Sequence, residues 1–290
     1  MPRAAFLSIE NTDGWFIDDD LVHEPLRKAG WEIENISWNH PADWNRFDLV
    51  IIRSPWDYQD HPDHFMNVLK AIEDSSAVLA NNLEIVRWNI HKDYLFELQE
   101  KGVELLPTRK IYSPGLSDIN ETFAALNATE LIIKPVIGAN ADDTFRLKKG
   151  LPDTYHHILQ QFRERECYLQ AFEENILNEG EFAVMYFNGK RAHTVLKTVK
   201  KGDFRVQEEH GGGVLAIPNP EKELLSAADR SMDAVPFIPL YARVDLVRTK
   251  DNSFALMELE LIEPCLYFRF DSSAPHDFAQ AIDAFWKRIN

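Results

Sequence analysis

The acidic side chains with the clearest chemical potential lie in two apolar segments near the C-terminus. Asp245 lies in the run Tyr241–Arg248, and Glu258 and Glu260 lie in the run Phe254–Ile262. Side chains alternate between the two faces of a strand, so Glu258 and Glu260 share one face. Three carboxylates close together repel one another unless a cation lies among them. Mg²⁺ prefers oxygen ligands and usually completes its shell with substrate phosphates, so the two segments predict a magnesium site.

The register of the two strands decides whether these acids meet. A hairpin whose loop is residues 250–253 pairs residue 249 with residue 254, and places Asp245 opposite Glu258 and Arg243 opposite Glu260. A slip of one residue would separate both pairs. The alternative is a solvated strand face that carries an ordinary Arg–Glu ion pair, and the pattern alone leaves both interpretations open.

Cations stand at two places where they could bind phosphate. Lys134 closes the apolar run Leu131–Pro135 just before a turn. Segment 197–213 holds four cations, Lys197 and Arg205 among them, and ends in three glycines. In an acidic chain such a cluster indicates an anion site, because ionised donors form strong hydrogen bonds with phosphate. The alternative for Lys134 is a lysine that reaches from a strand end into water, and the alternative for segment 197–213 is a basic surface loop.

A third cluster follows an expected strand in the first part of the chain. Arg53, Trp56 and Asp57 come directly after the apolar run 48–52. Ligands of parallel sheets bind beyond the carboxyl ends of the strands. Arg53 could clamp a carboxylate, Asp57 could receive an ammonium group, and Trp56 could form a wall, which together predict an amino-acid-like substrate. The structural alternative is that Arg53 and Asp57 form their own ion pair and Trp56 fills a seam between domains.

Strands and helices alternate over the first 80 residues. Strands are expected at 6–9, 31–37, 48–53 and 78–80, and helices at 20–29 and 61–73. Continuous apolar strands separated by helices predict a parallel sheet covered on both faces.

A helix over 82–102 that carries Lys92 leads into a second, smaller unit. Its strands are expected at 109–112, 131–135, 145–148 and 168–172, and its helices at 117–127 and 154–166. Two long strands, 181–187 and 193–198, then flank Asn188-Gly189, a strong hairpin signal. A helix over 221–233, the acidic strand pair and a terminal helix over 274–289 complete a chain whose subdomains should be intertwined.

Composition narrows the class of function. The 31 basic and 47 acidic residues give a net charge of −16, which disfavours nucleic acid and anionic membranes as partners. The apolar fraction of 45% provides for a buried core. The N-terminus lacks the cationic flank and long apolar run of a secretion signal, and the two cysteines, Cys167 and Cys265, favour reduced core thiols. These features predict a cytoplasmic protein.

Taken in chain order, these motifs resemble those of the ATP-grasp ligases. The matching residues are Lys92, Ile133-Lys134-Pro135, Leu169 to Phe172, Gly180-Glu181, Gly202 to Arg205, His210 to Gly213, Asp245 and Glu258-Leu259-Glu260. The branch that the chain most resembles contains glutathione synthetase, the ribosomal-protein glutamate ligases and the cyclo-ligase of cycloserine biosynthesis. The resemblance runs over essentially the whole chain.

The resemblance implies an α/β fold of three parts. A parallel-sheet pre-ATP-grasp domain would occupy residues 1–82. The small lid subdomain with its linking helix would occupy 83–172, and the C-terminal ATP-grasp subdomain would occupy 173–290.

The same resemblance implies a role for each site residue. Lys92 and Lys134 would contact the nucleotide phosphates, Gln170, Ala171 and Phe172 would meet the adenine, and Glu181 would hold the ribose. Lys197 and Arg205 would bind phosphate and the developing acyl phosphate, and Asp245, Glu258 and Glu260 would ligate Mg²⁺.

Two departures from the family pattern stand out. The family often has Asn at the position of Glu260, so this chain carries one more negative charge there. The glycine-rich lid is also reduced to residues 138–141, with one glycine, Gly138.

The implied reaction joins a small-molecule carboxylate to an amine at the expense of ATP, through an acyl phosphate. A kinase that stops after phosphoryl transfer and a catalytically silent nucleotide-binding subunit are the alternatives. A homodimer is left open as the assembly.

Overall fold

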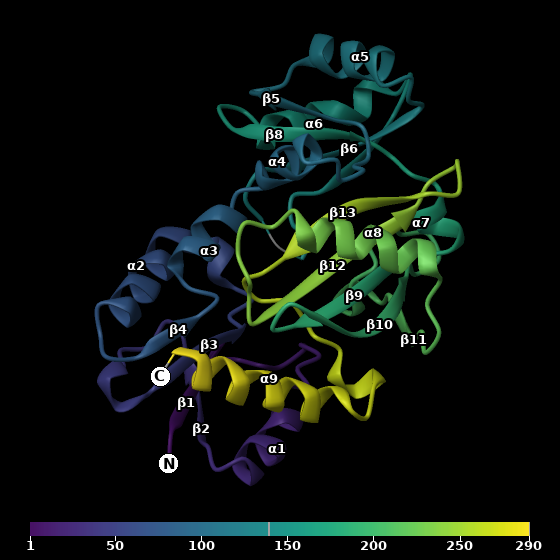
Figure 1. The fold of residues 1–290 in the computed structure, drawn as a ribbon. Coiled ribbons are helices and arrows are strands. Elements are labelled where there is room, and N and C mark those ends of the chain that lie inside the picture. The colour runs from purple at the N-terminus through teal and green to yellow at the C-terminus, as the bar shows by residue number, and fades with distance from the viewer. Residues whose placement is uncertain (139, 290) are drawn as a thin grey trace.

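A four-stranded parallel sheet forms the N-terminal part of the molecule (Figure 1). The structure is a computed structural model that describes residues 1–138 and 140–289. The strands are β1 (Arg3–Ser8), β2 (Glu32–Ser37), β3 (Leu49–Ser54) and β4 (Val78–Ala80), in the order β2-β1-β3-β4. All three pairings are parallel, which confirms the expected sheet.

Helices cover both faces of this sheet. They are α1 (His23–Lys28), α2 (Pro62–Glu73), α3 (Leu83–Asn89) and α9 (Ala274–Ile289). Phe6 and Ile51 belong to the core shared with α1 and α9, whereas Leu7 and Ile52 belong to the core shared with α2 and α3. Alternate residues therefore serve opposite layers, which is why the strands are continuously apolar.

A second, antiparallel sheet forms the lid. Its strands are β5 (Thr108–Tyr112), β6 (Glu130–Pro135), β7 (Phe145–Lys148) and β8 (Glu166–Ala171), in the order β5-β8-β6-β7. Helices α5 (Leu116–Ala125) and α6 (Tyr155–Gln161) pack on one face, and Figure 1 shows this unit at the top of the molecule. Ala139 lies outside the described residues.

The C-terminal sheet is antiparallel and lies between the other two. Its strands are β9 (Glu181–Phe187), β10 (Lys190–Thr198), β11 (Gly213–Ala216), β12 (Tyr241–Arg248) and β13 (Phe254–Glu260), in the order β11-β10-β9-β12-β13. Helix α8 (Lys222–Asp233) packs against it, and α7 (Asn175–Asn178) precedes β9. The short edge strand β11 was not expected, because the sequence analysis ended a polar loop at Gly213.

The single helix expected over 82–102 is wrong. The chain forms α3 and then α4 (Tyr94–Glu100), and Lys92 lies in the break between them. Its backbone N–H donates to the carbonyl oxygen of Val136 at 2.9 Å instead of to a helical partner. The tertiary contact with the turn after β6 therefore replaces a local helical bond.

The acidic strand pair has the expected pairs but not the expected hairpin end. Asp245 lies opposite Glu258 and Arg243 opposite Glu260. The last pair joins Arg248 to Phe254, so the expected pairing of residues 249 and 254 is wrong. A bulge between Asp245 and Leu246 leaves one extra residue on β13 and restores the register at the acids.

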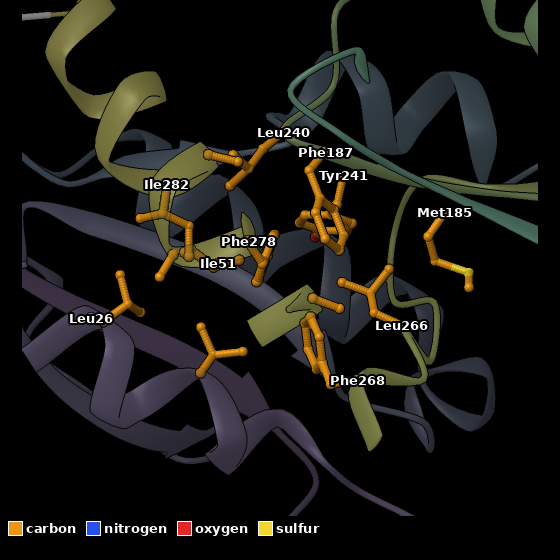
Figure 2. Packing of buried hydrophobic residues seen from close by; sticks show 14 of the residues in the cluster. Leu26, Ile51, Met185, Phe187, Leu240, Tyr241, Leu266, Phe268, Phe278 and Ile282 are labelled. Atoms are coloured by element: carbon orange, nitrogen blue, oxygen red, sulfur yellow. The ribbon is translucent and has the colours of Figure 1, made fainter. Parts of the chain in front are cut away.

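The C-terminal helix α9 returns to the N-terminal sheet (Figure 1). Its Phe278 and Ile282 share one core with Leu26 of α1 and with Tyr241 of β12, as Figure 2 shows. The ring centroids of Phe278 and Tyr241 lie 6.0 Å apart. The parts of the chain are intertwined as expected, since this core crosses from the expected 173–290 unit into the 1–82 unit; the division itself stays a prediction.

Candidate active site between the three sheets

Two adjoining cavities lie where the three sheets meet. The lid-side cavity is lined by residues of the lid sheet and the C-terminal sheet. The N-terminal-side cavity is lined by the C-terminal sheet and by the segment that follows β3. Lys92 and Glu258 line both cavities, so a molecule bound in one would meet a molecule bound in the other.

The lid-side cavity combines apolar walls with cations. Ile132 of β6, Phe172 after β8 and Met257 of β13 line it and belong to one apolar cluster. Lys134 and Arg205 line the same cavity. This combination suits a molecule that has a flat apolar ring and an anionic group.

Lys134 is positioned by the lid sheet. It lies opposite Tyr168 of β8, and its Nζ donates to Oε1 of Gln170 at 3.3 Å. Burial lowers the pKa of Lys134 to about 8, although Glu258 and Glu181 favour the charged form. The lysine is therefore close to losing its charge unless an anion binds beside it.

Arg205 is held by a neighbour on its own loop. Its Nη2 lies 2.8 Å from Oδ2 of Asp203, and this hydrogen bond holds the pKa of Asp203 well below its ordinary value. The guanidinium is thus kept in place at the cavity wall.

Lys197 of β10 lies between two carboxylates beneath the cavities. Its Nζ is 2.8 Å from Oδ2 of Asp245, and it also forms an ion pair with Glu181. Burial alone would lower the pKa of Lys197, but the two carboxylates raise it well above its usual value. Arg243 adds a second contact to Asp245 at 2.9 Å. Burial would raise the pKa of Asp245, and the two cations more than offset this and hold it below the ordinary value.

Glu258 and Glu260 face the N-terminal-side cavity. Lys92 forms an ion pair with Glu258 and also donates to the backbone oxygen of Gly138 at 3.0 Å. Arg243 forms an ion pair with Glu260. Burial, reinforced by the nearby carboxylates, raises the pKa of Glu260 to about 8 in spite of Arg243.

Contacts of the turn after β6 close the lid against the rest of the molecule. Nδ2 of Asn140 donates to the carbonyl oxygen of Trp56 at 3.4 Å, and Nε2 of Gln59 donates to Oδ2 of Asp142 at 3.3 Å. The ring Nε2 of His210 lies 3.2 Å from the carbonyl oxygen of Asn140. The lid, the N-terminal part and the loop before β11 therefore meet over the cavities.

Known proteins share this arrangement. Residues 4–81 match the family model for the N-terminal domain of the D-cycloserine synthetase DcsG. The cycloserine biosynthesis protein DcsG of Streptomyces lavendulae is 28% identical over 289 residues, which cover 92% of this chain and 93% of that protein. The crystal structure of D-cycloserine synthetase DcsG matches 98% of this chain and 99% of its own, with a TM-score of 0.86 and 25% identity.

A more distant structure extends the relationship. The ATP-grasp ligase PsnB, in complex with a minimal precursor, matches 98% of this chain and 99% of its own with a TM-score of 0.67 and 16% identity. The chain belongs to the ATP-grasp superfamily. Within the superfamily it lies near DcsG.

The ATP-grasp fold brings the expected nucleotide-binding residues together. All six line the lid-side cavity: Lys92, Lys134, Gln170, Ala171, Phe172 and Glu181. Arg205 lines the same cavity, and Lys197 lines the N-terminal-side cavity. Their chemical roles stay predictions.

The expected three-carboxylate metal centre is not assembled in this ATP-grasp chain. Asp245 is 1% exposed, lines neither cavity and is satisfied by Lys197 and Arg243. Over residues 1–138 and 140–289, no group of three or more His, Cys, Asp or Glu residues is arranged to hold a metal ion. Of the three expected ligands, Glu258 and Glu260 face the N-terminal-side cavity, and two carboxylates with substrate phosphates are an ordinary donor set for Mg²⁺.

The structure does not bring Arg53 and Asp57 together at either of the two cavities, so the expected substrate clamp is not seen there. Arg53 is 1% exposed, its Nη2 lies 2.9 Å from Oδ1 of Asp19, and it lines neither of the two cavities. Asp57 accepts a hydrogen bond from the indole of Trp38 at 2.5 Å. The two therefore form no ion pair with each other either, because each has a nearer partner. Of the three expected substrate residues only Trp56 lines the N-terminal-side cavity.

Two residues that the sequence did not indicate, Glu263 and Tyr267, line the N-terminal-side cavity with Trp56 and Tyr58. Both lie after the end of β13, where strand alternation no longer tells which way a side chain points. The only available signal was a further acid shortly after Glu258 and Glu260.

Proposed function

We propose that this protein is an ATP-dependent carboxylate–amine ligase that acts on an amino-acid-like small molecule through an acyl phosphate. The observation that carries the proposal is that Lys92 and Glu258 are shared by the two cavities. A nucleotide in the lid-side cavity would then present its terminal phosphate to a substrate in the N-terminal-side cavity.

The nucleotide would be held by the residues of the lid-side cavity. The adenine would lie between the apolar walls near residues 170–172, and Lys134, Lys92 and Arg205 would bind the phosphates. Charge-assisted contacts of this kind contribute about 1.5–3 kcal/mol each. Glu181 would reach the ribose, and its ion pair with Lys197 would set its orientation.

Magnesium fits the donor set of this site. Glu258 and Glu260 would hold the ion together with the nucleotide phosphates, and when bound it would neutralise charge on the phosphoryl group being transferred. The buried Asp245 would act through Arg243 by keeping that guanidinium beside Glu260.

The reaction needs positioning more than covalent help from the protein. A substrate carboxylate oxygen attacks the terminal phosphorus, ADP leaves, and an acyl phosphate forms. An amine then attacks the acyl carbon, loses a proton and expels phosphate. Lys92 and Arg205 would stabilise the charge that develops on the phosphoryl oxygens, and the closed lid would limit hydrolysis of the intermediate.

The similarity to DcsG supports an amino-acid-like substrate, because the match covers nearly the whole of both chains. No helix in the described part of the chain is long and apolar enough to cross a bilayer. A cytoplasmic location fits a ligase that draws on ATP, and a homodimer stays a prediction.

The test is a screen for substrate-dependent ADP release. Amino acids and small amines are supplied with ATP and Mg²⁺, and the products are analysed by mass spectrometry. We expect ADP and phosphate in equal amounts with a product that has lost water relative to its substrates. A stable phosphorylated product that needs no amine would establish the kinase instead. A silent subunit would bind ATP and release no ADP with any compound.

A further inference from the structure

Several aromatic side chains line the N-terminal-side cavity. Trp56, Tyr58 and Tyr267 line it, and Phe16 joins them from the segment after β1. Aromatic faces attract cations, and a carboxylate among them makes a site that is selective for a small ammonium group. Glu263 lines the same cavity, and the indole of Trp56 contacts its backbone.

Glu263 differs from three other carboxylates of this cavity. Glu258, Glu260 and Glu208 line the same cavity and form ion pairs with Lys92, Arg243 and Arg269 respectively. Glu263 is 9% exposed, and among the described residues no cation lies within ion-pair distance of it.

The surroundings of Glu263 are those of a group that lacks its counter-charge. Burial raises the pKa of Glu263 to about 7, although Tyr58 and the more distant Lys92 and Arg243 oppose the shift. A buried carboxylate is costly when unpaired, so a cationic ligand would relieve a strain that the free protein carries.

Three side chains donate hydrogen bonds to the backbone around Glu263. Nε1 of Trp56 donates to the carbonyl oxygen of Glu263 at 2.9 Å. Arg53 donates to the carbonyl oxygen of Pro264 at 3.1 Å, and Arg243 donates to that of Cys265 at 3.2 Å. The backbone that carries Glu263 therefore has a defined position before any ligand arrives, which lowers the entropic cost of binding. Arg53 thus supports the cavity without touching it.

We propose that Glu263, with the aromatic rings around it, binds the ammonium group of the substrate and so selects a primary amine of amino-acid type. This assignment rests on the proposed function, because only a ligase would use the bound ammonium compound as its substrate. It adds to that function the chemical group of the substrate that is recognised. A hydroxy acid of the same skeleton would lack the cation and would be rejected.

The test measures binding and does not depend on turnover. Matched pairs of small molecules that differ only in an ammonium or a hydroxyl group, such as alanine with lactate and serine with glycerate in both enantiomers, are titrated calorimetrically at pH 8. Saturating ADP and Mg²⁺ are present. In at least one pair we expect the ammonium compound to bind about tenfold or more tightly, and Glu263→Gln to erase this preference.

Two variants serve as controls. Glu209→Gln removes an exposed carboxylate that lines the same cavity and should keep the preference. Glu263→Asp retains the charge on a shorter side chain and should keep part of it, which separates loss of charge from loss of folding if Glu263→Gln melts early. An unchanged ADP affinity in Glu263→Gln shows that the nucleotide site is intact.

Either of two results would overturn the proposal: no ammonium preference in the wild type for any pair, or a preference that survives in Glu263→Gln. Substrate-dependent ADP release is measured in parallel. Amine binding without ADP release would refute the proposed ligase activity and support the ammonium site. ADP release without an ammonium preference would support the ligase activity and refute the ammonium site.

Discussion

The Nζ atom of Lys197 lies 2.8 Å from Oδ2 of Asp245, and neither side chain is more than 3% exposed. Lys197 also contacts Glu181, and Asp245 also contacts Arg243. The carboxylate expected to ligate a metal is thus the centre of a buried ionic network that joins β9, β10 and β12. It organises the floor of the site and is closed to a ligand.

Asp245→Asn should therefore damage stability first. The change leaves Lys197 and Arg243 with one anionic partner fewer, and breaking a buried pair costs about 3–5 kcal/mol. Because Glu181 and Glu260 remain, we expect the free energy of unfolding in denaturant to fall by about 3 kcal/mol. The exposed pair of Asp283 and Lys287 on α9 is the control, and Asp283→Asn should cost about 0.5 kcal/mol or less. Equal effects of the two variants would contradict a structural role for Asp245.

Arg53→Ala should also act on stability. The guanidinium is buried against Asp19 and lies 5.0 Å from the ring centre of Tyr241. Its loss leaves the carboxylate of Asp19 buried and unpaired, so we expect a loss of about 3–5 kcal/mol and a weaker affinity for both ATP and substrate. Lys70→Ala, which breaks an exposed pair with Asp74, should leave the melting temperature near that of the wild type. A normal melting temperature with only a raised substrate KM would restore Arg53 as a substrate contact.

Metal dependence should separate Glu258 from Glu260. A chelator should abolish ATP turnover, and Glu258→Gln should do the same while the protein keeps its fold, because both cavities lose a shared carboxylate. Glu260→Asn should retain partial activity, since Asn is common at this position in the family and still offers an oxygen ligand. Steady-state ADP release with a magnesium titration checks both variants. Turnover that persists in chelator would refute the metal assignment.

Nucleotide affinity should weaken at alkaline pH because of Lys134. Its pKa of about 8 lies below the ordinary lysine value, and binding of phosphate favours the charged form. Below pH 8 Lys134 is already charged in the free protein, so it should contribute no pH dependence to the Kd of ADP. Above pH 8 the free protein must take up a proton to bind, so the Kd should rise by up to about tenfold per pH unit. Calorimetry at several pH values measures this.

The matched variant for this pH dependence is Lys134→Met. It should bind ADP weakly at pH 7, and its Kd should rise less between pH 7 and pH 9.5 than that of the wild type, because the titration of Lys134 is absent and that of Glu260, whose pKa is about 8, remains. Glu258, Lys92 and Glu181 surround the lysine, and the first two titrate far from this range when paired with each other. A wild-type Kd that is the same at pH 7 and pH 9.5 would show that Lys134 does not bind phosphate.

The sequence by itself determined the class of fold and most of its elements. Strands such as β3 and β9 are short, nearly continuous apolar runs, which is the pattern of strands buried on both faces. The Asn188-Gly189 turn has both residues at positive φ, as a tight hairpin requires. The chain order of Lys92, Lys134, Arg205 and the acids of β13 was enough to indicate the ATP-grasp superfamily. These features are local patterns, or depend only on the order of motifs along the chain, so they can be recognised from the sequence.

Only the tertiary structure decided which side chains are open to a ligand. Arg53 and Asp245 have the residue types of a binding site, but each is buried beside a partner distant in the chain, Asp19 and Lys197. Glu263 carries no motif, yet residues from two distant segments, 53–56 and β12, hold the backbone of residues 263–265, and Glu263 lines a cavity without a counter-ion. A buried charge without a partner is costly because it has lost its contact with water, so each buried charge pairs with the opposite charge that the fold brings close. Which partner that is depends on distances between residues far apart in the chain, and these distances are set by tertiary packing.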